Sequence, residues 1–63
     1  MNLSECEKFV MKGFSEGLTA LEIAARQGWY SNLPHIFSAR VKKKLNARTR
    51  IQAVSICIRK GLI

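Results

Sequence analysis

Basic residues are the side chains of this sequence whose type and spacing could do chemistry. Nine of its eleven Lys and Arg lie between Arg26 and Ile63, a stretch with no acidic residue. All four acidic residues lie in the first third of the chain, and the 63 residues carry a net charge of +7. So uneven a charge distribution predicts a polyanionic partner. Nucleic acid is the first candidate and an anionic membrane surface the second.

Residues for other kinds of chemistry are few. The only histidine is His35, and the two cysteines, Cys6 and Cys57, lie near opposite ends, so no zinc-ligand spacing is present. No catalytic pair of acids and no Gly-rich phosphate loop occurs, so we expect no enzyme, cofactor or small-molecule ligand. We expect both thiols to be reduced and mostly buried in a cytoplasmic protein. A disulfide between the first and last helices is the alternative.

The densest basic run flanks the end of a predicted third helix. Such side chains would grip phosphates and fix the register of the protein on a duplex. The alternative is a solvated run, and Lys43 and Lys44 cannot both face one direction on a helix. No acidic partner is expected near this run. The candidates for phosphate contact are Thr19, Lys42, Lys43, Lys44, Arg48 and Arg50.

Residues earlier in the same helix are candidates for reading base edges. Arg40 lies in the middle of the helix and its guanidinium matches guanine O6 and N7, although a phosphate contact is an equal alternative. His35 could donate to a base or phosphate, or be a partly exposed surface histidine. Ile36 and Ala39 could touch a thymine methyl group or face the core instead. The base-reading candidates are His35, Ile36, Ala39 and Arg40.

Helix-start signals indicate the elements that position these residues. Capping boxes of the form S/T-x-x-E/Q begin at Ser4, Thr19 and Thr49. A further start, capped by Ser31 or Asn32, would place Pro34 in the first turn of a helix. Glycines suited to the left-handed residue after a helix stand at positions 17, 28 and 61, and Asn46 can end the third helix.

These signals predict one all-α domain of four helices, over about 4–16, 19–27, 32–46 and 49–60. Apolar residues recur at helical spacing and predict core rows. The rows are Phe9, Val10, Gly13, Phe14 and Leu18; Leu33, Phe37, Val41 and Leu45; and Val54, Cys57, Ile58 and Leu62. We expect Trp29 in the core, leave Tyr30 open, and expect Gly13 to admit a bulky neighbour such as Trp29 or Phe37.

The second and third predicted helices are joined by a short turn containing Gly28. A short helix, a Gly turn and a longer basic helix are the parts of a helix-turn-helix. The second of the two helices would lie in the DNA major groove.

Seven short segments of the chain, in order and spacing, resemble the LuxR/GerE-type helix-turn-helix domain of bacterial regulators. The matching segments are Leu3-Ser4 with Glu7, Val10-Met11, Glu16-Gly17-Leu18, Glu22-Ile23-Ala24, Lys44-Leu45, Arg50 with Gln52-Ala53-Val54, and Gly61-Leu62-Ile63. The resemblance implies four helices, with the third as recognition helix and the fourth as a common dimer contact. It also implies a bacterial or phage transcription regulator, similar to the stand-alone members that consist of this module only.

The chain departs from the family pattern at the turn and at the start of the recognition helix. Gln27 stands for a buried Leu, Leu33 for a Thr that often contacts phosphate, and Pro34 for a Val. His35 replaces a common base-reading Lys, and Ala39 another polar reader. These departures imply either an unusual DNA target or weak specific reading.

Two functions are therefore expected from the sequence. The first is a sequence-specific, homodimeric DNA-binding regulator, cytoplasmic and associated with the nucleoid, with residues 32–46 in the major groove. The second is a protein-interaction module that modulates a larger regulator through the last helix or a Trp29/Tyr30 patch. A basic membrane binder fits poorly, because the basic residues cluster beside a loop. The candidates for dimer contact are Ser55, Ile56 and Arg59.

Overall fold

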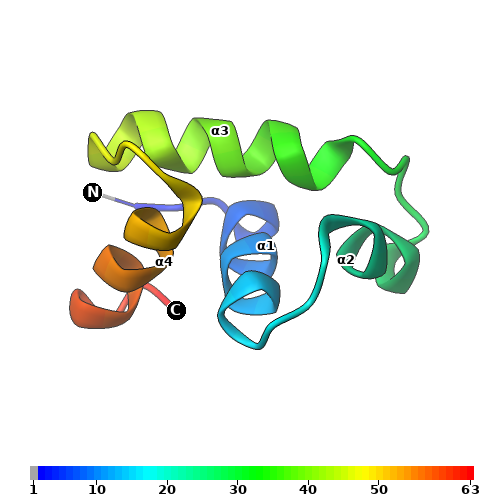
Figure 1. Ribbon diagram of the computed structural model, residues 1–63, viewed down its shortest axis with the longest axis horizontal. Helices are drawn as coiled ribbons and strands as arrows, with labels where there is room; N and C mark the ends of the chain where they lie inside the picture. Colours follow the sequence, from blue (N-terminus) through cyan, green and yellow to red (C-terminus); the bar gives the residue numbers. More distant parts are fainter. Residues whose placement is uncertain (1) are drawn as a thin grey trace.

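Four helices make up the fold of the computed structural model, which describes residues 2–63. They are α1 (Glu5–Ser15), α2 (Ala20–Gln27), α3 (Leu33–Leu45) and α4 (Arg50–Arg59). Residues 2–63 contain no strand, so the prediction of an all-α, four-helix chain is confirmed. Each observed helix boundary lies within one residue of the predicted range. In Figure 1, α3 crosses the top of the molecule, and α1, α2 and α4 lie beneath it.

The first two helices begin at reciprocal capping boxes, as predicted. The Ser4 hydroxyl accepts from the Glu7 backbone N–H at 3.1 Å, and Glu7 Oε1 accepts from the Ser4 N–H at 2.8 Å. Thr19 and Glu22 form the same two bonds. Thr19 Oγ1 accepts from the Glu22 N–H at 3.1 Å, and Glu22 Oε1 accepts from the Thr19 N–H at 2.9 Å. Hydrogen bonding to the backbone N–H of Thr19 lowers the pKa of Glu22. Each box satisfies two amides that the helix itself leaves without an acceptor.

The predicted reciprocal box at α4 is wrong in one of its two bonds. Thr49 Oγ1 accepts from the Gln52 N–H at 3.0 Å, as expected. Gln52 Oε1, however, accepts from the N–H of Arg48 at 2.7 Å, one residue before the cap. A glutamine side chain can reach either amide, and here it ties the preceding loop to the helix start.

The start of α3 has no side-chain cap, so the prediction that Ser31 or Asn32 would supply one is wrong. Asn32 lies at the cap position with φ −87° and ψ −12°, a helical rather than an extended conformation. Pro34 lies in the first turn as predicted, where its missing N–H leaves no bond unmade.

Residues in the left-handed conformation end both α2 and α3. Gly28 follows α2 with φ 68°, and Asn46 follows α3 with φ 55°. Gly17 and Gly61 also have positive φ, so the predicted helix stops are confirmed. Asn is the ordinary residue that tolerates this region best, because its short amide can bond locally.

The core lies where α3 packs across the three other helices. Val10 and Met11 of α1, Ile23 of α2 and Val41 of α3 are fully buried. The α3 row predicted from the sequence faces this core: Val41 is buried, and Leu33, Phe37 and Leu45 are half-buried. Trp29 lies half-buried between two aromatic rings, 5.8 Å from the centroid of Phe9 and 5.4 Å from that of Phe37.

Two expectations about burial are wrong. Ile58, predicted for the core, is 57% exposed, because the α4 face turned inward is the one that carries Ala53 and Cys57. Cys6 is exposed rather than buried, while Cys57 is buried and desolvation raises its pKa. Both thiols are free, so the alternative of a disulfide is excluded in this structure.

Gly13 accommodates a side chain of α2 rather than Trp29 or Phe37 as expected. A Cβ at position 13 would lie 2.7 Å from Ile23 Cγ1 and 2.8 Å from its Cδ1. Gly13→Ala is therefore expected to destabilise the fold by about 1–2 kcal/mol, although Ala gains about 1 kcal/mol in helix propensity. Thermal unfolding checks this. In an Ile23→Ala background, where both Cγ1 and Cδ1 are absent, the Gly13→Ala change should cost less stability than in the parent. A Gly13→Ala protein more stable than the parent would contradict it.

Candidate nucleic-acid interface

Helix α3 buries one side and leaves the other open to solvent. Its buried residues are Pro34, Ser38 and Val41, which recur at the three- and four-residue spacing of one helix face. The four residues predicted to read bases, His35, Ile36, Ala39 and Arg40, are all exposed. Ile36 and Ala39 therefore do not face the core, the alternative that the sequence left open.

Three residues lie along the middle of this exposed face. At about 100° per residue, Ile36, Ala39 and Lys43 point within one narrow sector opposite Val41. All three are exposed, and Ile36 is 40% accessible. We call these three residues the α3 stripe. It combines two small apolar surfaces with one ammonium group.

Arg40 lies at the edge of the exposed face rather than on the stripe. Its guanidinium carbon is 5.6 Å from the centroid of the Phe37 ring, one turn earlier in the helix. A guanidinium over an aromatic face gains a cation–π attraction of about 0.5–1 kcal/mol at an exposed site. This contact restricts the side chain, so Arg40 is better placed for a flanking contact than for the centre of a groove.

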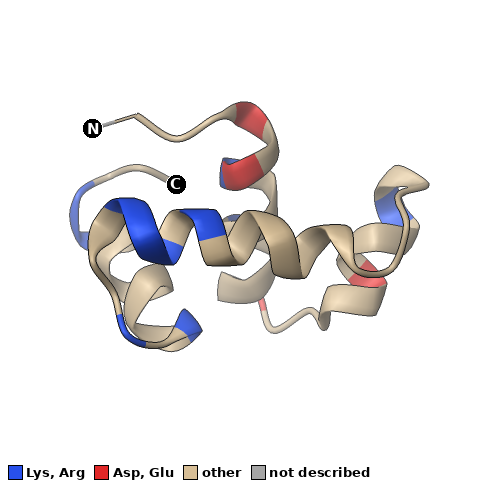
Figure 2. Ribbon diagram, turned by 90° about the horizontal axis from the view of Figure 1, so that it is seen from above, with Lys and Arg blue, Asp and Glu red and all other residues tan. Residues whose placement is uncertain are grey.

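Basic residues gather around the C-terminal half of α3 and the segments beside it (Figure 2). Lys43 is exposed and Lys42 half-buried, on neighbouring sides of the helix. Arg48 in the following loop and Arg50 at the start of α4 are exposed at the same end. The N-terminal half of α3 has no charged residue, so the positive charge of this helix is confined to its C-terminal half.

Lys44 points away from this group toward α1. Its Nζ lies 2.6 Å from Glu7 Oε1, and the Glu7 side chain is 3% exposed. The expectation that the basic run has no acidic partner is therefore wrong for Lys44. A role for Lys44 in phosphate contact stays a prediction, but its ammonium would first have to leave a buried carboxylate.

Glu7 joins the start of α1 to the end of α3. Its Oε1 accepts both from the Ser4 N–H and from Lys44, which lies 37 residues later in the chain. Burial raises the pKa of Glu7, but the hydrogen bonds from Lys44 and Ser4 and the charge of Lys44 outweigh it and leave that pKa lowered. The ionised form of the carboxylate is thus favoured, and its ion pair joins the start of α1 to the end of α3.

Two further phosphate candidates are restrained by local contacts. The Arg50 guanidinium carbon lies 4.1 Å from the Phe14 ring centroid, so its plane covers an aromatic face. Thr19 accepts from the Glu22 N–H, which leaves its own hydroxyl hydrogen free to donate. Both residues are exposed, and both remain predictions for phosphate contact.

The apolar surface of α4 differs from the one expected. Ile56 is half-buried, whereas Ile51 and Ile58 are 80% and 57% exposed. Ile51 and Ile58 are seven residues apart and share one helix face. From the sequence, Ile51 had no predicted role and Ile58 was expected in the core, although their seven-residue spacing was a visible signal that they share a face. Ser55 and Arg59 are exposed as expected, and the dimer role of all three predicted residues stays a prediction.

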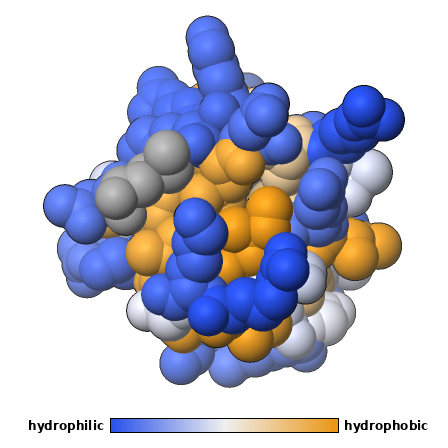
Figure 3. Space-filling model, turned by 90° about the vertical axis from the view of Figure 1, so that its left-hand side faces the viewer, coloured by the Kyte–Doolittle hydropathy of each residue, from blue (hydrophilic) through white to orange (hydrophobic). Residues whose placement is uncertain are grey.

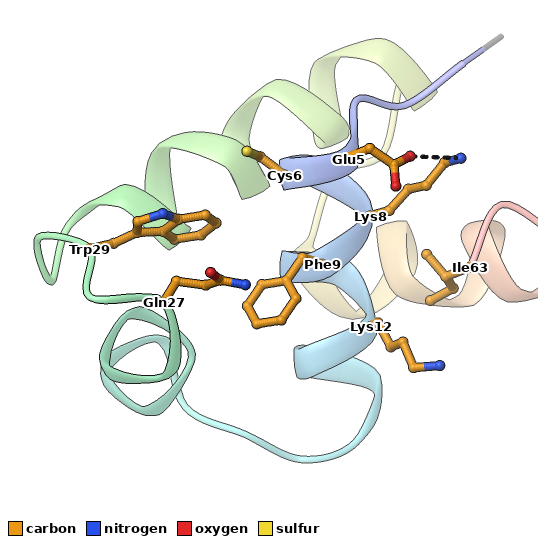
Figure 4. Close-up of a pocket in the computed structure, with 8 residues that line it drawn as sticks. All are labelled: Glu5, Cys6, Lys8, Phe9, Lys12, Gln27, Trp29 and Ile63. Carbon is orange, nitrogen blue, oxygen red and sulfur yellow. Dashed lines mark ion pairs between the residues drawn. The ribbon is translucent and has the colours of Figure 1, made fainter.

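An open hollow of about 590 Å³ lies beside α1 (Figure 4). It is lined by Glu5, Cys6, Lys8, Phe9, Lys12, Gln27, Trp29 and Ile63. Glu5 and Lys8 form an exposed ion pair across one helical turn, at 3.4 Å. Gln27, where the family pattern has a buried Leu, is exposed at the rim, and Trp29 supplies the apolar packing at this corner. Tyr30 is 83% exposed.

Residues 2–63 bring together no group of three or more His, Cys, Asp or Glu that could hold a metal ion. None of the helices within that range has the length and apolar character needed to cross a bilayer. Comparison with known proteins finds no matching family, no matching curated protein and no matching solved structure.

Proposed function

We propose that this chain is a LuxR/GerE-like DNA-binding transcription regulator that places α3 in the major groove. The observation that supports this most is the composition of one surface. The exposed side of α3 holds all four base-reading candidates, with lysines and arginines at one end and no acidic residue. A helix of 13 residues is about 20 Å long, and the major groove, about 12 Å wide, admits a helix.

The basic residues would supply affinity and the stripe would supply selectivity. Lys43, Arg48 and Arg50 would neutralise phosphates and release counterions, so binding should weaken steeply as salt rises. Ile36 and Ala39 offer no hydrogen bonds. The thymine methyl group is the only apolar feature of a base edge in the major groove. The stripe therefore favours half-sites with thymine near their centre.

We expect deoxyuridine substitution to test this reading directly, since it removes only the thymine methyl. Replacing central thymines by deoxyuridine should weaken binding about three- to tenfold, equivalent to roughly 0.7–1.4 kcal/mol for a buried methyl contact. In the variant Ile36→Ala the same replacement should have a smaller effect. Equal affinity for thymine and deoxyuridine duplexes would rule out methyl recognition while leaving DNA binding intact.

A homodimer would place two copies of α3 on an inverted repeat. The face of α4 that carries Ile51 and Ile58 is the apolar surface available for self-contact. Half-sites would then lie about 34 Å apart, one turn of DNA. Ile58→Lys is expected to shift any dimer to monomer and to lower affinity for the paired site more than for a single half-site. Analytical ultracentrifugation with DNA titration measures both, and a parent protein that stays monomeric on its DNA would exclude the dimer.

The experiment that tests the function is selection of DNA from a random pool at low and near-physiological salt, followed by sequencing. The expected result is an enriched, roughly palindromic motif that persists at the higher salt. DNA retained without an enriched motif, or no DNA retained at all, would contradict the proposal. A protein that retains no DNA would favour the alternative of a protein-interaction module, for which the exposed Tyr30 and the hollow beside Trp29 offer a surface.

A further inference from the structure

A second hollow lies at the end of the molecule where α3 and α4 both finish. It has a volume of about 400 Å³. Its lining residues are Lys44, Leu45, Asn46, Ile56, Arg59 and Lys60. We call this the end hollow. The two helices that form its walls also pack against each other, and both supply buried residues to the core, Val41 from α3 and Cys57 from α4, so its shape is set by the fold.

The floor of the end hollow is apolar and its rim is cationic. Leu45 and Ile56 are half-buried, and Arg59 and Lys60 are exposed beside them. Figure 3 views this end of the molecule and shows apolar surface in the centre with hydrophilic side chains around it. Paired apolar anchors within a charged rim are the usual anatomy of a small protein-recognition site.

The rim has free positive charge. No acidic residue lines the hollow. Within residues 2–63, ion pairs involve only Lys8 and Lys44, so neither Arg59 nor Lys60 has a carboxylate partner. Part of their charge is offset by the C-terminal carbonyls of two helices. Two flexible cations beside an apolar floor nevertheless favour a ligand that is both acidic and apolar.

We infer that the end hollow docks an acidic, amphipathic segment of a partner protein. A large apolar side chain of that segment would cover Leu45 and Ile56, while carboxylates one turn away would meet Arg59 and Lys60. Nucleic acid fits less well, because phosphates would use the cations and leave the apolar floor in water. A second copy also fits less well. Three of the four acidic side chains of the chain, Glu5, Glu7 and Glu22, are already engaged in ion pairs or a helix cap, and Glu16 alone could not meet both rim cations.

This site lies off the DNA-facing side of α3. On the helix, Lys44 and Leu45 point to the flank and the core, away from the α3 stripe of Ile36, Ala39 and Lys43. A partner segment in the end hollow would thus leave the stripe open. The inference does not rest on DNA binding. If α3 does bind DNA, the domain could bind an acidic partner protein at the same time.

Selection from a displayed library of random peptides on the purified full chain tests the inference. The expected result is enrichment of peptides that combine Asp or Glu with Leu, Ile, Phe or Trp at helical spacing. The best of them is then titrated by fluorescence anisotropy. No enrichment, or enrichment of peptides without acidic residues, overturns the inference.

Matched charge reversals locate the binding site. Lys60→Glu, at the rim, is expected to weaken the selected peptide about tenfold. Lys12→Glu, an equal change of charge on the exposed face of α1, should weaken it less than about threefold. Ile56→Ala should weaken binding at least as much as Lys60→Glu, with thermal unfolding run to confirm a folded variant. Equal effects of Lys60→Glu and Lys12→Glu would show that only net charge matters and would overturn the site.

Discussion

Lys43→Glu is expected to lower affinity for DNA about 30- to 100-fold at low salt. Lys43 is the one cation on the α3 stripe, exposed and without an acidic partner. On the proposed interface, its reversal would remove a phosphate contact and would place a negative charge against the DNA backbone. Together these changes cost about 2–3 kcal/mol. The neutral variant Lys43→Gln should lose less and should reduce the slope of log affinity against log salt by about 1.

The control for this prediction is Lys12→Glu, which changes the net charge equally at the end of α1 that lies away from α3 (Figure 4). Its expected loss is less than about threefold, because an exposed charge beyond about 10 Å is largely screened at 0.1 M salt. Affinities are measured by anisotropy with one labelled duplex across several salt concentrations. Losses of similar size for the two variants would show that DNA binding is a property of net charge and would remove α3 from the proposed interface.

Glu7→Gln is expected to lower the stability of the domain by about 1–2 kcal/mol. The glutamine keeps an oxygen for the Ser4 N–H but loses the charge that holds Lys44 at 2.6 Å. Lys44 itself is 39% exposed, so its ammonium can turn to water and is not left buried without a partner. For a domain of this size the loss corresponds to a fall in Tm of about 5–15 °C.

The capping box of α2 provides the matched control. Glu22 makes the same two cap hydrogen bonds with Thr19 as Glu7 makes with Ser4, but it is exposed and has no lysine partner. Glu22→Gln should therefore change Tm much less than Glu7→Gln. A double-mutant cycle with Lys44→Met isolates the ion pair. If Tm falls by the same amount in the two glutamine variants, the capping box alone accounts for the loss of stability and the Glu7–Lys44 ion pair contributes nothing.

The contribution of Glu7 to the stability of the fold should also depend on pH and should be lost in acid. Because the folded pKa of Glu7 lies below its unfolded value, the stability that Glu7 contributes is fully present above the unfolded pKa. It is lost as pH falls through the folded pKa. The Tm difference between the parent and Glu7→Gln should thus be constant near neutral pH and vanish in acid. A difference that persists after Glu7 is protonated would contradict the ion-pair explanation.

Local chemistry accounts for what sequence reasoning could predict. The capping boxes at Ser4 and Thr19, the stop at Gly28 and the inward row of Val41 depend on residues three or four apart. Such contacts form within one helical turn, whatever the rest of the chain does. The asymmetry of charge is likewise a property of the sequence alone, and it is sufficient to propose a polyanionic partner.

Tertiary packing decided the features that depend on segments distant in the chain. Glu7 meets Lys44 only because α3 lies across α1, and Gly13 admits Ile23 because α2 packs closely there. The angle of α4 in the bundle exposes Ile58 and half-buries Ile56, although both are apolar and two residues apart. Composition and spacing narrow these outcomes, but burial follows from how helices fill shared volume. The sequence by itself therefore determined the four helices and their ends. Only the tertiary structure decided where each basic side chain points and which surfaces stay exposed for partners.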